Sequence, residues 1–452
     1  MSSKTKTTAT KEEARSALVP KLRFPEFRGA KMWASEPMGE VYSFKGNNSL
    51  SRDKLNYLAG SVRNIHYGDI HTKFSSHFDI TKELVPFINE SEEGVVRDEN
   101  LCAEGDIIFA DASEDMADIG KCIEIVSLNG ECVVSGLHTI LARQAGDRIA
   151  LGFSGHLFKS AWVRTQIQKE AQGTKVLGIS ANRMRNLRLP MPHAKSEQQK
   201  IAECLSSVDE LMAAQSRKVA ALKTHKKGLM QQLFPREGET QPRLRFPEFQ
   251  NAGEWVSRTG TEITSKITKG SSPNWQGFSY QTQGVLFVTS ENVRDGFLDV
   301  SEPKFLPGEF FAKQSNSHLL YADILINIVG ASIGRNCVYR LKEPAFTNQA
   351  VALFRVTKEH SFEFVSYCYQ QDLAQKAVSA SQSDSARPNL SLADLRNMKF
   401  LIPSLPEQHR IADCLSSLDA LITAETQKHE ALKTHKKGLM QQLFPSPEEI
   451  ES

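Results

Sequence analysis

Two stretches of the chain place apolar side chains at alternating steps of four and three residues. They are residues 197–235 and 407–445. The apolar positions are Ile201, Leu205, Val208, Met212, Val219, Leu222, Leu229 and Leu233, then Ile411, Leu415, Leu418, Ile422, Leu432, Leu439 and Leu443. This spacing is the heptad seam of a coiled coil. Pro235 and Pro445 end both patterns, and a helix of about 37 residues would be roughly 55 Å long.

Polar residues interrupt both seams, and such residues weaken packing but fix register. They are Gln215, Lys226, Glu425, His429 and Lys436. We expect the helices to pair with each other in antiparallel orientation, as two similar units related by a pseudo-twofold axis would do. The alternative is that each helix covers the core of its own domain. The length and narrowness of the stripe favour pairing.

The helices belong to an internal repeat. Residues 221–235 and 431–445 are both ALKTHKKGLMQQLFP, and a second motif, LRFPEF, begins at Leu22 and at Leu244. A repeat of about 200 residues is too long for a solenoid unit. The chain is therefore a duplicated domain with its helix.

Between the constant motifs lie two divergent blocks, residues 36–192 and 256–403. Three strand-like stretches match between them: 103–122 with 321–337, 133–144 with 345–356, and 173–192 with 384–403. Short strands mixed with a few helices predict an α+β domain in each block. A shared framework with different loops predicts two domains that bind related but non-identical targets.

Composition narrows the class of protein. Hydrophobic residues make up 40% and charged residues 24% of the chain, which is ordinary for a soluble globular protein, and the net charge is only +2. No apolar run is long enough for a membrane span. The seven cysteines are scattered singly, which suits a reducing cytoplasm. We therefore expect a cytoplasmic protein.

These motifs together resemble the specificity subunit of type I restriction–modification systems, from Leu22 to Pro445. The resemblance rests on LRFPEF before each block, on GDIIFA and ADILIN followed by Ile-Gly-Lys or Ile-Gly-Arg, on the run at 389–419, and on the duplicated helix. The first block departs from the common pattern, because its loop at 111–120 is longer and more acidic than the loop at 329–334.

The resemblance implies an α+β fold with two similar target-recognition domains joined by a pair of long helices that form an antiparallel coiled coil. The expected order is a disordered tail (1–20), the first target-recognition domain (21–192), the first spacer helix (193–235), a linker (236–243), the second target-recognition domain (244–403), the second spacer helix (404–445) and a C-terminal tail (446–452).

It also implies the function and the partners. Each domain would read one half of an asymmetric, bipartite site in double-stranded DNA, and the helices would set the spacing. Two modification subunits would methylate adenine with S-adenosylmethionine. Two restriction subunits, using ATP and Mg²⁺, would join where the system also cuts DNA. The subunit itself would hold no cofactor or metal, carry out no chemistry and contact no membrane.

Candidate DNA contacts are polar and basic residues at loops and strand ends. In the first block they are Ser113, Lys121, His138, Lys175, Asn182, Arg183 and Arg185; in the second, Ser271, Ser272, Asn274, Gln276, Ser290, Asn292, Arg335, Asn348, Gln349, Arg387 and Arg396. The arginines could instead form a solvated edge, and Arg185 and Arg396 could pair with framework carboxylates. The loop at 271–276 could instead be a surface loop that Trp275 anchors to the core.

A further set is assigned to the coiled coil and to partner docking. It comprises Ile201, Leu205, Val208, Leu222, Lys226, Leu229, Ile411, Leu415, Leu418, Leu432, Lys436 and Leu439. The repeated basic cluster around Lys226 and Lys436 is expected to contact a partner protein rather than DNA, because these lysines fall on the seam.

Motifs for chemistry are missing from the sequence. It contains no Pro-Pro pair for an adenine methyltransferase motif, no phosphate-binding Gly-x-x-x-x-Gly-Lys-Ser/Thr loop, and no His/Cys spacing typical of zinc. A stand-alone DNA-modifying enzyme is therefore disfavoured. A coiled-coil scaffold is disfavoured too, because it leaves the unequal loops unexplained.

Overall fold

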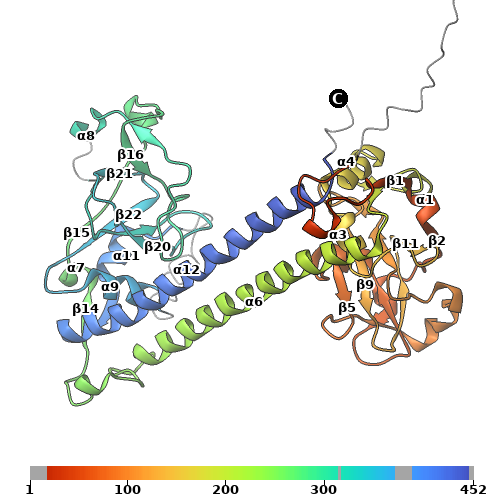
Figure 1. Cartoon of the computed structure of the whole chain (residues 1–452). Helices are drawn as coiled ribbons and strands as arrows, with labels where there is room; N and C mark the ends of the chain where they lie inside the picture. The colour runs from red at the N-terminus through yellow and green to blue at the C-terminus, as the bar shows by residue number, and fades with distance from the viewer. Residues whose placement is uncertain (1–17, 314–316, 372–388, 447–452) are drawn as a thin grey trace, which may run out of the picture. The chain divides into compact units, whose positions relative to one another are not determined.

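The protein is described by a computed structural model covering residues 18–313, 317–371 and 389–446 (Figure 1). It divides into two compact units: unit 1 is residues 1–215 with 428–452, and unit 2 is residues 216–427. Each unit holds one domain of strands and short helices, the start of one long helix and the end of the other. None of the helices in the described ranges is long and apolar enough to cross a membrane.

The domain of unit 1 is built on a five-stranded sheet. Its order is β2 (Tyr42–Lys45), β11 (Thr139–Gln144), β7 (Ile107–Ala110), β9 (Cys122–Ser127) and β5 (His77–Asp79). All neighbours are antiparallel except β5 and β9. In β7, Ile107 and Phe109 belong to one apolar cluster, while Ile108 and Ala110 belong to another. Both faces of the sheet are covered, which explains why β7 is continuously apolar.

Smaller elements complete unit 1. The second sheet is β10 (Cys132–Ser135), β4 (Val62–Ile65), β6 (Phe87–Ile88) and β3 (Leu55–Asn56). Two pairs are β1 (Ala34–Pro37) with β13 (Arg188–Met191) and β8 (Ala112–Ser113) with β12 (Leu177–Gly178). The α-helices are α1 (Met38–Val41), α2 (Tyr67–Thr72), α3 (Phe153–Leu157), α4 (Ala161–Glu170) and α5 (Ala181–Met184). The 3₁₀ turns are η1 (Pro25–Phe27), η2 (Arg52–Lys54), η3 (Glu90–Val95) and η4 (Asp98–Asn100).

Unit 2 has the same plan. Its main sheet is β15 (Thr264–Lys269), β22 (Val351–Val356), β19 (Ile324–Asn327) and β20 (Asn336–Val338). The second sheet is β17 (Phe305–Leu306), β16 (Val285–Val288), β21 (Ala345–Thr347) and β18 (His318–Leu319). The other elements are β14 (Val256–Thr259) paired with β23 (Lys399–Ile402), α7 (Gly260–Ile263), α8 (Phe310–Lys313), α9 (Phe362–Tyr369), α11 (Leu392–Asn397), η5 (Pro247–Phe249) and η6 (Asn274–Gln276).

The faint sequence matches between the blocks fall on equivalent elements. Strands β7 and β19 each pair with the long strand β11 or β22, and β10 and β21 each lie parallel to a strand of the second sheet. One difference stands out. Within the described residues the sheet of unit 2 ends at β20, whereas β5 continues the sheet of unit 1 beyond β9.

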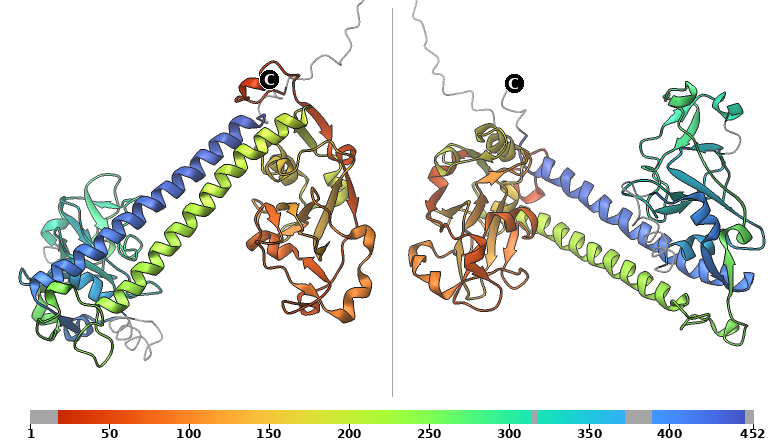
Figure 2. Two further views of the ribbon diagram at one scale, coloured as in Figure 1. Left: turned by 60° about the horizontal axis from the view of Figure 1, so that its bottom comes forward. Right: turned by 180° about the vertical axis from the view of Figure 1, so that it is seen from behind.

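The two long helices are α6 (Lys195–Leu233) and α12 (Leu405–Leu443), with 39 residues each. At 1.5 Å per residue each is roughly 58 Å long. Both end just before the prolines, as predicted. In each unit the start of one helix lies beside the end of the other and runs in the opposite direction (Figure 2), so the antiparallel pair is confirmed.

The ends of the helices also pack into the domain cores. In unit 1, Ile201 and Leu205 share an apolar cluster with Leu443 and Phe444 at the end of α12. In unit 2 the equivalent cluster contains Ile411, Leu415, Leu233 and Phe234. The two arrangements considered from the sequence therefore both occur. The helix ends cover domain cores, and the polar seam positions further along join helix to helix.

Those seam positions hold ion pairs. Lys436 Nζ lies 2.5 and 2.6 Å from the carboxylate oxygens of Asp209 in unit 1. In unit 2 the equivalent Lys226 lies 2.7 and 2.8 Å from those of Asp419. The lysine side chains are only 16% and 15% exposed. The prediction that both lysines lie on the seam is confirmed.

The LRFPEF motif ties each domain to both helices. Arg23 pairs with Glu197 of α6 in unit 1 at 2.6 and 2.7 Å. Arg245 pairs with Glu407 of α12 in unit 2 at 2.7 Å. The charge–charge hydrogen bond raises the pKa of each arginine. The preceding leucine donates its N–H to the end of the other helix in both units. Leu18 is already buried in the core, so the packed part of unit 1 begins inside the stretch expected to be a tail.

Candidate nucleic-acid interface

In unit 2 the predicted polar residues gather where the parallel strands β16 and β21 end. Asn348 donates its backbone N–H to Val288 O at 3.1 Å, and Gly270 donates to Asn348 O at 3.1 Å. A Cβ on Gly270 would lie 1.6 Å from Thr347 O, so only glycine allows this approach. The contact brings the loop that begins at Ser271 beside the strand ends.

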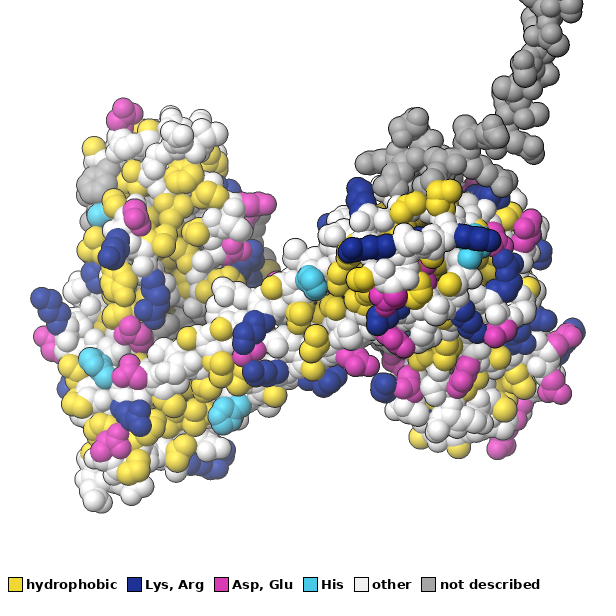
Figure 3. Space-filling view, in the orientation of Figure 1, with side chains coloured by type: hydrophobic (Ala, Val, Ile, Leu, Met, Phe, Trp, Pro, Cys, Tyr) yellow, Lys and Arg dark blue, Asp and Glu magenta, His cyan; other side chains and the backbone are white. Residues whose placement is uncertain are grey.

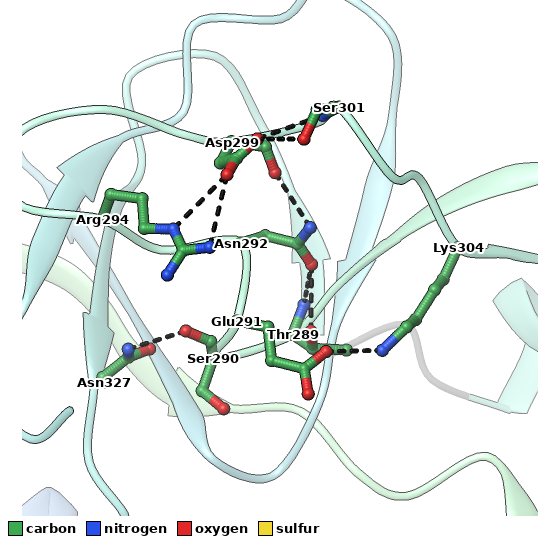
Figure 4. A network of polar contacts seen from close by, with 9 residues as sticks. All are labelled: Thr289, Ser290, Glu291, Asn292, Arg294, Asp299, Ser301, Lys304 and Asn327. Atoms are coloured by element: carbon green, nitrogen blue, oxygen red, sulfur yellow. Dashed lines mark hydrogen bonds and ion pairs between the residues drawn. The ribbon is translucent and has the colours of Figure 1, made fainter. Parts of the chain in front are cut away.

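The loop after β19 joins the same edge through Asn327. Its side-chain Nδ2 donates to Ser290 O at 2.9 Å (Figure 4) and to Ser332 Oγ at 3.0 Å. Arg335, at the end of this loop, is half-exposed and lies 3.7 Å from Asp295. Predicted residues from three separate segments therefore share one edge of the domain.

Asn292 supports this edge from within. Its Oδ1 accepts from Thr289 N at 2.8 Å and from Thr289 Oγ1 at 3.0 Å, and its Nδ2 donates to Asp299 O at 2.9 Å (Figure 4). The residue is 8% exposed. Its amide is occupied in closing the turn, so it shapes the surface rather than forming it.

Ion pairs fix the flanks of this turn. Glu291 and Lys304 lie 2.7 Å apart, which lowers the pKa of the carboxyl and raises that of the amine. Ser301 donates to Asp299, which lowers the pKa of Asp299, and Arg294 lies 3.4 Å from the same carboxylate (Figure 4). The turn is therefore held in one shape before any ligand arrives.

The loop at 271–276 carries a Trp275 side chain that is 94% exposed. The interpretation that Trp275 anchors the loop to the core is therefore wrong. Gln276 Nε2 donates to Ser271 Oγ at 2.6 Å and braces the loop from inside. Ser272 is half-buried and Asn274 is exposed. An exposed indole on a braced polar loop is suited to stacking on a base or sugar.

The remaining candidates of unit 2 have different surroundings. Gln349 and Arg396 are exposed, and Arg396 donates to Ile267 O at 3.3 Å. Asn348 Oδ1 accepts from Ala350 N at 3.1 Å. Arg387 lies outside the described residues.

In unit 1 the equivalent edge is centred on Asp111 and His138. Asp111 donates its N–H to His138 O at 3.1 Å, and the two side chains lie 3.2 Å apart. Burial raises the pKa of Asp111. His138 has φ +55°, a left-handed conformation that costs non-glycine residues roughly 1 kcal/mol and often marks functional positions.

Other predicted residues surround this pair. Ser113 lies on β8, whose partner β12 leads to Ile179, and Ile179 N donates to Asp111 O at 2.9 Å. Asn182 is exposed shortly after that strand. Lys121 Nζ donates to His71 O at 2.7 Å and so holds its loop to α2.

The sequence reasoning missed an aromatic group beside His138. The Tyr67 ring lies 5.3 Å from His138, 4.7 Å from His66 and 6.1 Å from His71, measured between ring centroids. Burial lowers the pKa of His66. These residues follow β4, as Thr289 and Ser290 follow β16. The strand-end position that singled out Ser290 was therefore a signal for His66 and Tyr67 as well.

The basic residues of unit 1 have mixed surroundings. Arg183 pairs with Glu170 at 3.0 Å, and Arg185 lies 5.0 Å from the centre of the Phe44 ring. Lys175 is exposed. Among the residues that the structure describes, neither Arg185 nor Arg396 forms the framework ion pair considered from the sequence. That role belongs to two other arginines, in the pairs Arg143–Asp106 and Arg355–Asp323.

Charge is distributed evenly on the visible face of each unit. Lysine and arginine side chains alternate with aspartate and glutamate there and form no continuous basic patch (Figure 3). This agrees with the net charge of +2. Recognition by such a surface depends on placed polar and aromatic groups more than on total charge.

Three residues that could serve as metal ligands come together in unit 1, although no sequence spacing indicated them. His77, His156 and Asp209 are far apart in sequence but meet in unit 1, with ligand atoms within 4.8 Å of one another. Sequence spacing missed them because they come from a strand, a short helix and α6.

A duplicated framework with different polar loops on equivalent edges defines a protein with two recognition domains. The family model described as "Type I restriction modification DNA specificity domain" matches residues 38–224 and 281–434, more than half of the chain. The chain therefore belongs to this family, and the resemblance stated from its motifs is confirmed. Members of the family are the DNA-recognition subunits of type I restriction–modification systems.

Two individual relatives and one solved structure are consistent with this family. The chain is 25% identical over 399 residues to the putative type I restriction enzyme MjaX specificity subunit of Methanocaldococcus jannaschii, covering 87% of this chain and 88% of that protein. It is 25% identical over 298 residues to the MjaVIII specificity subunit of the same organism, covering 64% and 69%. The crystal structure of the type I S subunit from M. genitalium shares the fold, with TM-score 0.57, 16% identity and coverage of 94% and 99%.

Proposed function

We propose that each domain reads one half of a split, asymmetric site in double-stranded DNA. One observation carries this proposal. The two domains share their framework contacts, including Arg143–Asp106 and Arg355–Asp323, but differ at the strand-end edge. Unit 1 presents Tyr67 and His138 there, with His66 buried behind them, and unit 2 presents Ser290 and Trp275. Domains that share a framework but differ in their edge residues are suited to two different half-sites.

The long helices set the number of base pairs between the halves in this proposal. Each is one uninterrupted helix of 39 residues, and ion pairs at the seam specify register. Inserting four residues, about one helical turn, into α6 should change the preferred gap or abolish assembly. An unchanged gap in an intact complex would contradict this role.

Two identical methyltransferase subunits dock on the repeated helix ends. Residues 221–234 and 431–444 have the same sequence and the same order of exposed, half-buried and buried positions. Each therefore presents the same face, including the exposed Lys223 and Lys433, to a partner. The partners would supply S-adenosylmethionine-dependent adenine methylation, and two restriction subunits would supply ATP- and Mg²⁺-dependent cleavage. This chain would position them on DNA without taking part in the chemistry.

Methylome sequencing tests the recognition proposal. Deleting the gene should remove one split methylated motif, and exchanging blocks 36–192 and 256–403 should exchange the two half-sites. As a control, a silent recoding of both blocks should leave the motif unchanged. If no split motif disappears on deletion, or if the exchange leaves the half-sites in their original order, the proposal is wrong.

A further inference from the structure

Three potential metal ligands converge in unit 1 although 132 positions separate the first from the last (209 − 77). His77 lies on β5, His156 on α3 and Asp209 on α6. One ligand atom from each lies within 4.8 Å of the others, and the two imidazole rings are 4.3 Å apart between centroids. Gly155 permits this approach, since a Cβ there would lie 2.8 Å from His77 Nε2.

A hydrogen bond orients His77 so that one of its ring nitrogens can bind a metal ion. His77 Nε2 is 2.7 Å from Gly152 O; it must donate to that carbonyl, which leaves the lone pair of Nδ1 available. A backbone carbonyl is a usual orienting partner of a metal-bound histidine.

His156 has an unexplained polar atom. The residue is fully buried, and its Nε2 lies 3.2 Å from Ser206 Oγ. Its Nδ1 has no hydrogen-bond partner within the described part of the chain. Leaving a buried nitrogen without a hydrogen-bond partner is unfavourable, so its retention calls for a function.

Unit 2 has a different side chain at the position equivalent to His156. Phe364 stacks on Phe234 and contacts Trp255, as Phe153 contacts Phe444 and Trp33 in unit 1. Three residues after each phenylalanine stands His156 in unit 1 and Tyr367 in unit 2. The Tyr367 hydroxyl donates to Asp419 at 2.7 Å, so a phenol satisfies the helix carboxylate there. In unit 1 the phenol is replaced by an imidazole, and the additional strand β5 brings a second imidazole.

We propose that His77, His156 and Asp209 form a binding site for one divalent transition-metal ion, with zinc the ion that fits best. Two imidazole nitrogens and one carboxylate oxygen are ligands that zinc accepts, with a fourth position left for water. Bonds of about 2 Å require the ligand atoms to move inward by up to about 0.7 Å. The ion would join β5 and α3 of the recognition domain to helix α6.

Neighbouring cations limit the affinity. Lys436 Nζ contacts both oxygens of Asp209, so an ion must share the carboxylate with the ammonium. Lys159 adds a second positive charge close to His77. Replacing Lys436 with glutamine should therefore tighten binding, by about tenfold for 1.4 kcal/mol of relieved repulsion.

The test is a titration of the full chain with Co²⁺ and Zn²⁺. We expect one ion per chain, read by the visible absorption of bound Co²⁺ and by calorimetry with Zn²⁺. His156→Tyr, which installs the side chain that unit 2 carries, should fold and lose at least tenfold in affinity. His77→Asn should lose a similar factor, Lys436→Gln should gain, and the exposed control His193→Tyr should bind like the parent.

The outcomes separate cleanly. If the parent binds no ion, or if His156→Tyr and His77→Asn bind as tightly as the parent, any uptake is adventitious and the proposal is overturned. Thermal unfolding checks that each variant folds, and His77→Asn carries the test if His156→Tyr does not. Ion binding is measured without DNA, so the result stands apart from the proposed recognition function.

Discussion

The lysine–aspartate pair between the long helices has different neighbouring side chains in the two units. In unit 2, Asp419 accepts from Lys226 and from the Tyr367 hydroxyl, and the lysine lies 5.0 Å from the centre of that ring. In unit 1, Asp209 accepts from Lys436 beside two imidazoles. The helix residues match and the domain residues do not. The constant helices therefore accommodate different domain side chains beside the same lysine–aspartate pair.

A second contrast concerns the tryptophan that follows LRFPEF. Trp33 Nε1 donates to Glu197 Oε1 at 3.2 Å. Trp255 is buried in the equivalent cluster, but its Nε1 has no partner among the residues described. Glu197 therefore has two kinds of side-chain donor, whereas the equivalent Glu407 relies on Arg245. This difference can be measured.

The largest effect should come from Arg245→Ala. Glu407 is 1% exposed and Arg245 8% exposed, and removing one partner of a buried pair typically costs about 3–5 kcal/mol because a buried charge is left alone. Peptide-resolved hydrogen exchange in increasing urea should show unit 2 opening at lower denaturant. The double variant Arg245→Met with Glu407→Leu should recover much of the loss.

Arg23→Ala should cost less than Arg245→Ala, by about 1 kcal/mol, because the Trp33 indole still donates to Glu197. The same exchange experiment measures unit 1. Trp33→Phe combined with Arg23→Ala should remove the advantage. Equal costs for the two single arginine variants would show that the indole contact contributes nothing.

The next largest effect concerns DNA and rests on the proposed function. Trp275→Ala should weaken binding of the full chain with its methyltransferase partner to its target by about 1–3 kcal/mol, the usual contribution of a base–aromatic stack. Unfolding should be unchanged because the side chain is almost wholly exposed. Val256→Ala, also exposed in unit 2, is the control in a fluorescence anisotropy titration. Unaltered affinity would remove Trp275 from the interface.

Tyr367→Phe should have a smaller effect. It deletes the 2.7 Å hydrogen bond to Asp419 but keeps the ring beside Lys226, so unit 2 should lose about 1 kcal/mol. The exposed Tyr321→Phe should lose nothing in the same urea titration. A loss equal to that of Arg245→Ala would mean that the hydroxyl holds the helix to the domain as strongly as the arginine pair does.

Local sequence patterns predicted the long helices and the framework strands. The heptad spacing located α6 and α12 to within a few residues, and it placed Lys226 and Lys436 on the seam. The apolar runs predicted β7 and β19. Such features depend on periodicity within one segment, so they can be read without knowing what the segment packs against.

Features that depend on distant segments could not be read in this way. Asn292 looked like a binding residue, but its amide is used by Thr289 and Asp299. Trp275 looked as suited to a core as to a surface. His77 and His156 become neighbours only because the additional strand β5 pairs beside β9. In each case the decisive partner lies on another element, whose position is set by tertiary packing.

The smallest difference between the units concerns Arg410 and Lys200, which occupy equivalent positions on α12 and α6. Arg410 lies 3.0 Å from Glu248 and 4.5 Å from the centre of the Phe246 ring. Lys200 lies 3.7 Å from Glu26 and 5.9 Å from the Phe24 ring. All four charged side chains are about half exposed, so solvent screens both pairs, and each contributes roughly 0–1 kcal/mol.

Arg410→Ala should therefore destabilise unit 2 by about 0.5 kcal/mol, and Lys200→Ala should fall below that, because a planar guanidinium stacks on an aromatic ring better than an ammonium does. Arg410→Lys should reduce the cost in unit 2 to that of unit 1. Raising salt to 1 M should remove the ion-pair part and leave the stacking part. If the arginine advantage disappears entirely in high salt, the contact with Phe246 is incidental and the carboxylate alone accounts for the difference.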